Sequence, residues 1–187
     1  MKLGMINLKL IVFALVLIIG CNGDNDSTDC IGPNCGSIDE KECSSYFDHN
    51  ISSTAAVYSF ISVTIGGALV DPLDIVGAFK DDVCVGTRQW NTSQCGSGIC
   101  DIYAHGDEGS TYTDGYCVIG DIPTFKIFDA SEDIYYEAEA AGIVIKNPSE
   151  GSSECEGEAP NCMEWSSLGI IIIDSLKAIT ASVLNCD

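Results

Sequence analysis

Cysteine content restricts the folding of this chain more than any other feature of its sequence. Eleven cysteines occur in 187 residues, and no two of them form a C-x-x-C pair. His49 and His105 are the only histidines, so the ligand spacing of structural zinc sites is missing. So many thiols are a liability in a reducing cytosol and a disulfide framework in an oxidising compartment. We therefore expect an exported domain that disulfides stabilise.

The N-terminus has the pattern of an export signal. Basic residues precede an apolar run at 10–19, which has the length of a signal peptide and is short for a membrane span. Residues 17–21, Leu-Ile-Ile-Gly-Cys, resemble the lipobox of bacterial lipoproteins. The resemblance implies a signal peptide at 1–20, lipidation of Cys21 and a polar tether at 21–29. An ordinary secretory signal, cut at the same place, is the alternative.

Acylation of Cys21 would leave ten cysteines, an even number that can close five disulfides. The expected disulfide cysteines are Cys30, Cys35, Cys43, Cys84, Cys95, Cys100, Cys117, Cys155, Cys162 and Cys186. Closeness in sequence suggests two local bridges, and one longer bridge would join neighbouring strands. The predicted pairs are Cys95 with Cys100, Cys155 with Cys162, and Cys84 with Cys117.

The chain is strongly acidic, with a formal net charge of −20 at pH 7. Its basic residues beyond the leader are isolated, whereas binding to a phosphate backbone needs clustered Lys and Arg. We therefore expect no nucleic-acid partner, and contact with a membrane through the lipid anchor only.

Carboxylates near predicted strand ends make calcium the best cofactor candidate, because Ca²⁺ takes about six to eight oxygen ligands. The sequence has no EF-hand loop, so separate loops would supply the ligands, and solvated turn aspartates are the alternative. The candidate ligands are Asp74, Asp81, Asp82, Asp107, Asp114 and Asp129. We expect no redox or nucleotide cofactor.

Apolar residues recur with a period of two from about residue 54 to residue 165, without a sustained helical stripe. Strands at 75–79 and 83–90 flank a polar turn and predict a hairpin. The other predicted strands lie at 57–65, 100–104, 124–128, 135–138, 142–146 and 170–173. Short strands without helices between them predict an all-β fold, an antiparallel Ig-like or jelly-roll-like β-sandwich stabilised by disulfides.

One such domain is expected at 54–187, after a Cys-rich N-terminal segment at 30–53. Residues 147–165 are expected to form a long surface loop pinned by its local disulfide. The stretch 175–185 fits a strand or a short helix, and its β-branched residues favour the strand. Residues 179–187 can then fold back as an extra strand, or insert into the next subunit as a donated strand that builds a filament.

The chain lacks a recognisable set of acid, base and nucleophile, so we expect no enzymatic activity. No G-x-S-x-G motif occurs, and His105 at a predicted strand end suits packing better than catalysis. Trp90 and Trp165 are candidates for stacking on a glycan, although they can equally belong to the core. Five tyrosines are further aromatic candidates: Tyr103, Tyr112, Tyr116, Tyr135 and Tyr136.

Short motifs follow one another along the chain in a recognisable order. They are Ile-Val-Gly-Ala-Phe at 75–79, Cys-Val-Gly at 84–86, Ala-His-Gly-Asp at 104–107, Asp-Gly at 114–115, Phe-Lys-Ile-Phe-Asp-Ala-Ser at 125–131 and Ile-Asp-Ser-Leu-Lys-Ala at 173–178. This order resembles a β-sandwich module, often repeated, of secreted surface proteins from marine and gliding bacteria. The resemblance implies a non-catalytic surface module without a particular ligand. This chain departs from the pattern in its single copy and its many cysteines.

These features together predict a non-enzymatic structural or adhesive surface protein that contacts itself or surface polymers, with strand exchange into a filament as one form. The alternative is a carbohydrate-binding surface lipoprotein. In either case the protein would be exported, as an outer-membrane or cell-surface lipoprotein or as an extracellular protein.

Overall fold

The computed structural model describes residues 47–149 and 152–182. Several predicted features lie outside the described residues: the leader at 1–20, the lipidation site Cys21, the tether at 21–29, and Cys30, Cys35, Cys43 and Cys186. The strands are β1 (Ala55–Ile65), β2 (Ala68–Leu69), β3 (Ile75–Lys80), β4 (Val83–Gln89), β5 (Cys100–His105), β6 (Thr124–Asp129), β7 (Ile134–Lys146), β8 (Cys155–Glu158) and β9 (Ile170–Ser182). Two short 3-10 helices, η2 (Thr92–Gln94) and η3 (Gly96–Gly98), lie between β4 and β5. Within the described ranges, no helix is long and apolar enough to cross a membrane.

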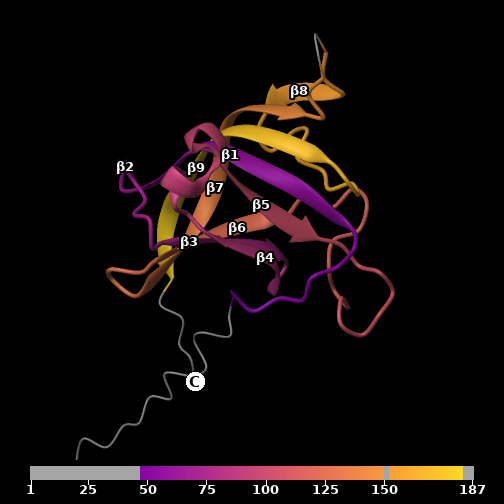
Figure 1. Ribbon diagram of the computed structural model, residues 1–187, viewed down its shortest axis with the longest axis horizontal. Helices are drawn as coiled ribbons and strands as arrows, with labels where there is room; N and C mark the ends of the chain where they lie inside the picture. The colour runs from indigo at the N-terminus through magenta and orange to yellow at the C-terminus, as the bar shows by residue number, and fades with distance from the viewer. Residues whose placement is uncertain (1–46, 150–151, 183–187) are drawn as a thin grey trace, which may run out of the picture. The chain divides into compact units, whose positions relative to one another are not determined.

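All described strands belong to one mixed sheet (Figure 1). Its order is β2-β1-β9-β7-β6-β3-β4, with β5 also paired to β1 and β8 also paired to β7. β1 and β9 run parallel, so that Val57 lies opposite Ile170, whereas the other strand pairs are antiparallel. The predicted all-β class is confirmed, and the predicted hairpin at 75–79 and 83–90 is β3 and β4.

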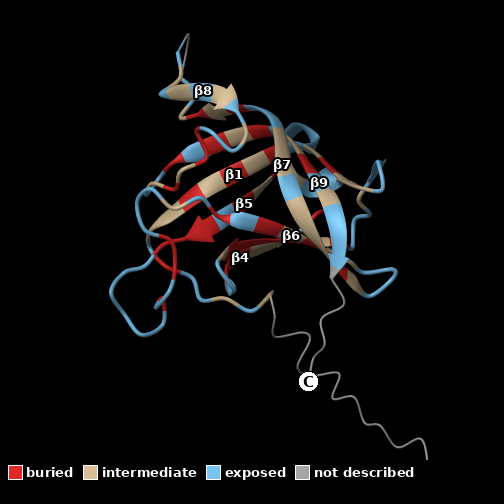
Figure 2. Cartoon of the chain, turned by 180° about the vertical axis from the view of Figure 1, so that it is seen from behind, coloured by how far each residue is buried: buried red, intermediate tan, exposed pale blue. Residues whose placement is uncertain are grey.

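The architecture differs from the predicted antiparallel sandwich, because the sheet curls strongly into a half-barrel instead of forming two clear Ig-like layers (Figures 1 and 2). β1, β7 and β9 are 11, 13 and 13 residues long and bend with the curl. Alternating apolar residues bury one face of a strand in either architecture. The sequence pattern therefore predicted most of the strands, although β8 lies in the predicted surface loop at 147–165 and the predicted strands at 135–138 and 142–146 are one strand, β7. The pattern did not distinguish one curled sheet from two packed ones.

A β-bulge in β7 helps to bend the sheet. The register with β9 shifts between Ala141 and Val144, and Gly142 within this bulge has a φ of +86°. A side chain at Gly142 would also collide with Asp174, whose Oδ2 accepts a hydrogen bond of 2.8 Å from the Ile143 amide. Bulges increase strand twist and bend a sheet locally, so glycine is required at this point of the curl.

The concave side of the sheet holds the main core, which is rich in aromatic rings. The Phe60 and Phe125 rings pack edge to face with centroids 5.0 Å apart, and Trp90 packs 6.0 Å from Phe60. Trp165 donates a hydrogen bond of 2.8 Å to the Ala104 carbonyl. Trp90 and Trp165 are only 2% and 4% exposed, so the prediction that they stack on a glycan is wrong and the core alternative holds.

The curl brings β4 against β5, although these strands lie at opposite ends of the sheet order. The α-carbon of Gly86 approaches the backbone of Tyr103 so closely that a methyl group there would overlap the Tyr103 carbonyl oxygen. Beside this contact, Arg88 forms an ion pair with Asp101. Glycine allows such close backbone approach, and the two contacts close the curl.

The C-terminal strand lies in the middle of the sheet. β9 pairs with β1 on one edge and with β7 on the other. Residues 179–182 continue this strand, with Thr180 opposite Glu137 and Ser182 opposite Tyr135. The strand prediction is therefore confirmed as far as residue 182, where the chain continues β9 within the sheet and does not form an extra strand. Residues 183–187 lie outside the described ranges.

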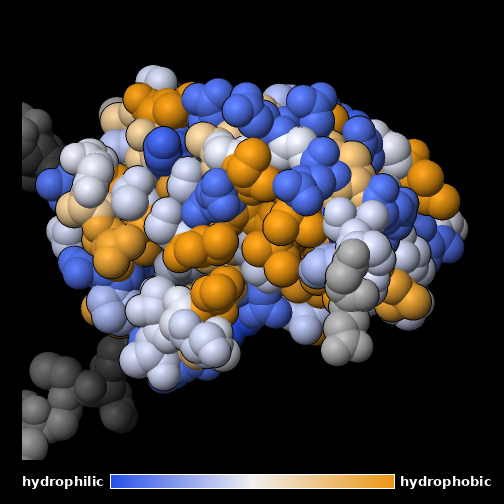
Figure 3. Space-filling view, turned by 90° about the horizontal axis from the view of Figure 1, so that it is seen from above, coloured by the Kyte–Doolittle hydropathy of each residue, from blue (hydrophilic) through white to orange (hydrophobic). Residues whose placement is uncertain are grey.

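The convex face of the sheet carries exposed apolar side chains. Ile61 on β1 is 54% exposed and Ile170 on β9 is 46% exposed, and Ile143 on β7 is also exposed. Figure 3 shows apolar side chains gathered in the centre of the face that it views. This surface differs in chemistry from the polar pocket described next.

Candidate functional site

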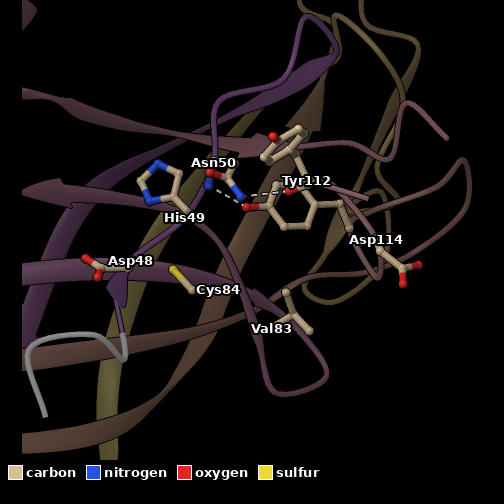
Figure 4. Close-up of a pocket in the computed structure, with 8 residues that line it drawn as sticks. Asp48, His49, Asn50, Val83, Cys84, Tyr112 and Asp114 are labelled. Atoms are coloured by element: carbon tan, nitrogen blue, oxygen red, sulfur yellow. Dashed lines mark hydrogen bonds between the residues drawn. The ribbon is translucent and has the colours of Figure 1, made fainter. Parts of the chain in front are cut away.

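A surface pocket of about 330 Å³ lies between three segments of the chain (Figure 4). The first is residues 48–50, the second is the start of β4, and the third is the loop at 112–116. The lining residues are Asp48, His49, Asn50, Val83, Cys84, Tyr112, Asp114 and Tyr116. The pocket combines an exposed aromatic ring with several polar groups, so it is more polar than the mostly apolar sites that bind drug-like molecules.

One wall of the pocket belongs to the N-terminal strap, defined here as residues 47–54. Phe47 fixes the strap, because its ring packs edge to face on Phe79 and stacks on Tyr135, with centroids 5.6 and 5.3 Å away. Gly77 makes room for this ring, since a methyl group there would lie 2.5 Å from it. The strap therefore lies on the convex side of β3, outside the main core.

Hydrogen bonds join the strap to the loop at 112–116. The Asn50 amide donates to the Tyr116 hydroxyl at 2.6 Å, and the Asn50 side-chain amide donates to the Tyr112 carbonyl at 2.8 Å (Figure 4). Tyr116 is buried, and its ring belongs to the main core. The two walls of the pocket are thus held together, so the pocket is formed without a ligand.

Behind the strap, His105 is buried at the end of β5, as its predicted packing role requires. Its Nδ1 accepts a hydrogen bond of 3.2 Å from the Ser52 amide, and its ring stacks on His49 with centroids 5.7 Å apart. Burial, and then the neighbouring His49, lower the pKa of His105 below its usual value. A neutral His105 keeps Nδ1 available as the acceptor that holds the strap.

Glu108 holds the strap at its far end. Its carboxylate accepts hydrogen bonds from both the amide and the hydroxyl of Ser53. The hydroxyl bond, followed by the amide bond, lowers the pKa of Glu108. The strap is therefore attached at both ends by side chains of the core domain.

Cys84 lies at the base of the pocket as a buried free thiol. Its Sγ lies 3.5 Å from the Phe47 carbonyl, to which the thiol donates weakly. Desolvation raises the pKa of Cys84 to about 11. Because the thiolate is the nucleophilic form of cysteine, this thiol is not activated for covalent catalysis at neutral pH.

The predicted disulfide between Cys84 and Cys117 is absent, and both residues are free thiols. Successive side chains of a strand point to opposite faces. Val85 and Cys117 belong to the main core, whereas Cys84 pairs across the hairpin with Phe79 on the convex side. The sequence showed two cysteines near neighbouring strands but not that they face opposite sides of the sheet.

The other two predicted disulfides are confirmed. Cys95 is bonded to Cys100 and Cys155 to Cys162, with α-carbons 5.0 and 5.6 Å apart. The first closes the connection that contains η2 and η3, and the second joins β8 to the following turn. Such bonds persist in oxidising compartments, so they indicate a location outside the cytoplasm.

The electrostatic character of the pocket comes from its two carboxylates. Asp48 and Asp114 are exposed and lie at opposite ends of the group of lining side chains (Figure 4). No lysine or arginine lines the pocket, and His49 contributes the one imidazole. The ion pairs of the described residues involve acidic groups outside the pocket, as in the pair of Lys80 with Asp121. The negative charge of the pocket is therefore not neutralised by its own walls.

The predicted calcium ligands do not converge. The described part of the chain contains no cluster of three or more His, Cys, Asp or Glu side chains suited to a metal ion. Asp74 is buried and accepts hydrogen bonds from the Asp71 and Ala130 amides at 2.7 and 3.0 Å. The remaining candidates lie in separate turns: Asp81 and Asp82 between β3 and β4, Asp107 after β5, Asp114 in the pocket and Asp129 at the end of β6.

Two of these turn aspartates also hold backbone amides. Asp107 accepts a hydrogen bond of 2.7 Å from Gly109, and Asp129 accepts one of 2.9 Å from Ser131. Hydrogen bonds from Ser131 and Glu132 lower the pKa of Asp129 against the opposing effect of desolvation. These carboxylates therefore stabilise local turns, which is the alternative weighed against calcium.

Sequence reasoning identified only part of this pocket. Tyr112 and Tyr116 were among the aromatic candidates, and Asp114 was among the acidic ones. Asp48 and Asn50 were missed, because they belong to the segment assigned to the Cys-rich N-terminus. The aromatic Phe47 ahead of them was the one available signal that this segment packs on the domain.

Comparisons of the chain with models of protein families, with curated proteins and with solved structures found no match. The resemblance to surface modules of marine and gliding bacteria therefore stays a prediction.

Proposed function

We propose that this protein is a non-enzymatic adhesive domain on the outside of the cell, and that the pocket beside the N-terminal strap is its binding site. In this proposal lipidation of Cys21 attaches the chain to a membrane, and the polar tether at 21–29 lets the domain reach outward. The disulfides support export, because they form in oxidising compartments.

The observation that carries the proposal is an exposed tyrosine at the edge of a ready-made polar pocket. Tyr112 is 75% exposed, while its carbonyl is held by Asn50. Aromatic rings with one polar end are common in binding surfaces, because they give a large contact area at little entropic cost. The neutral thiol of Cys84 supplies no nucleophile, which favours binding over covalent catalysis.

Adhesion of protein-coated beads to immobilised surface polymers tests this proposal. Tyr112→Ala removes the ring and leaves the Asn50 hydrogen bond to the backbone intact, so we expect lost adhesion in a folded protein. Tyr103→Ala is the matched control, because Tyr103 is 50% exposed on β5 and does not line the pocket. Equal adhesion of both variants and the unaltered chain would refute the proposed site.

Carbohydrate binding is the second candidate, and the same tyrosine favours it. An exposed ring beside the amide of Asn50 and the carboxylate of Asp114 offers stacking and hydrogen bonds to one sugar. A glycan array separates this role from contact with protein surfaces. Saturable binding to glycans that disappears in Tyr112→Ala would support it, and an array without binding would leave protein surfaces as the target.

Self-association belongs to the same proposal. The exposed Ile61 and Ile170 on the convex face are its available apolar surface, whereas residues 179–182 are engaged inside the sheet. Sedimentation velocity over a range of concentrations checks it. A protein that stays monomeric at every concentration would refute self-association and leave adhesion through the pocket standing.

A further inference from the structure

We propose that the pocket selects basic sugars, that is, glycan units that carry a free, protonated amine. This inference rests on the proposal that the pocket is the adhesive site and names the chemistry of its ligand. Three properties of the lining residues lead to it: the excess of hydrogen-bond acceptors, the two carboxylates without a lysine or arginine, and the exposed ring beside both.

Acceptors outnumber donors around the pocket. The carboxylates of Asp48 and Asp114 have no hydrogen-bond or ion-pair partner among the described residues. The side-chain amide of Asn50 donates one of its two N–H groups to the Tyr112 carbonyl, and its oxygen remains an acceptor. The Tyr116 oxygen already accepts from the Asn50 amide. A ligand that supplies several N–H and O–H donors therefore matches these groups best.

Charge restricts the ligand further. Two carboxylates line the pocket and no lysine or arginine does, in a chain whose formal net charge is −20. Sulfated and uronic sugars would be repelled by both charges. A protonated amine would be attracted, and its hydrogen bonds to a carboxylate would be charge-assisted and stronger than neutral ones.

The exposed ring favours a sugar over a small free amine. Tyr112 offers its face to solvent, and Val83 adds a partly exposed apolar side chain to the same pocket. The C–H face of a pyranose ring packs against an aromatic face, and a nearby cation is attracted to the same π-system. An amino sugar combines the C–H face that packs on the ring with the cation that the ring attracts.

Calorimetric titration with two matched probes tests the inference. The probes are the tetrasaccharide of glucosamine and the tetrasaccharide of N-acetylglucosamine, which differ in their amine charge. We expect saturable binding of the first, weakened by added salt, and none of the second. Asp48→Asn and Asp114→Asn should each weaken binding by about two- to fivefold, the range for an exposed charge pair. Glu158→Gln, an exposed acid on β8, is the control and should change nothing.

Backbone amide NMR shifts during a parallel titration locate the bound sugar. Cys84 lines the pocket, whereas Cys117 is a buried free thiol in the main core. The glucosamine tetrasaccharide should shift the amide of Cys84 and leave the amide of Cys117 unchanged. Equal shift changes at both residues, or at neither, would overturn binding in this pocket.

The outcomes distinguish this inference from the proposed function. Equal binding of both tetrasaccharides, lost in Tyr112→Ala, would overturn selection of basic sugars and leave adhesion through the pocket standing. Tighter binding of tetralysine than of either sugar would overturn the sugar class. Adhesion of beads that depends on Tyr112, without binding of either tetrasaccharide, would also refute the inference alone. Bead adhesion unaffected by Tyr112→Ala would refute both.

Discussion

Gly86 is the position where the closure of the curled sheet can be tested by one methyl group. An alanine Cβ at this position would lie 1.9 Å from the carbonyl oxygen of Tyr103 and 2.9 Å from its carbon. Real Cβ atoms keep at least about 3 Å from such atoms, so the backbones of β4 and β5 would have to separate by roughly 1 Å. The obstacle is backbone, so no side-chain rotation relieves it.

The expected cost follows from what that separation disturbs. Overpacking in a packed interior costs about 1–3 kcal/mol and occasionally more. Here the shift would also disturb the ion pair between Arg88 and Asp101 and the buried Val85 beside Gly86. We therefore expect Gly86→Ala to lower the free energy of unfolding by about 3 kcal/mol, at the upper end of that range.

Urea unfolding followed by tryptophan fluorescence measures this cost, because Trp90 and Trp165 are both buried. Gly96→Ala is the matched control, since a Cβ at Gly96 meets nothing within 4 Å. The control should be neutral or stabilising by up to about 1 kcal/mol. Equal stability of Gly86→Ala and Gly96→Ala would show that β4 and β5 do not touch and that the sheet is more open than described.

Three further predictions concern the stability of other parts of the domain. The pKa of His105 is lowered in the folded state, so the unfolded chain binds more protons at this residue and stability should fall as the pH drops below about 6.5. Thermal unfolding at a series of pH values checks this, and the fall should be smaller in His105→Gln. Replacing Cys95 and Cys100 together by serine should lower the unfolding free energy by about 2 kcal/mol, the closure entropy of a short loop, as measured by urea titration. Asp74→Asn keeps the shape of the side chain but replaces one acceptor by a donor that faces an amide. This change should lower the free energy of unfolding by about 1–3 kcal/mol, with or without added calcium, in the same urea titration.

The local structure of this domain could be predicted from its sequence. Alternating apolar residues and the polar turn at 80–82 predicted the hairpin of β3 and β4, and the short spacing of Cys155 and Cys162 predicted their bond. These features depend on residues that are close in the chain. Strand periodicity and local disulfides are therefore accessible without a structure.

Features that depend on distant residues could not be predicted in the same way. The parallel pairing of β1 with β9 joins residues more than a hundred positions apart, and no local pattern encodes it. Burial of Trp90, which follows β4, depends on Phe60 of β1. The pocket depends on Phe47, which fixes the strap on the far side of the sheet from the main core.

In our proposal the pocket beside the strap is where this domain binds its ligand. Backbone NMR during titration with the glucosamine tetrasaccharide tests that claim most directly, because every described segment reports separately. We predict shift changes confined to residues 48–50, 83–84 and 112–116. Changes centred instead on the convex face around Ile61 and Ile170 would contradict the claim and assign binding to the apolar surface of the sheet.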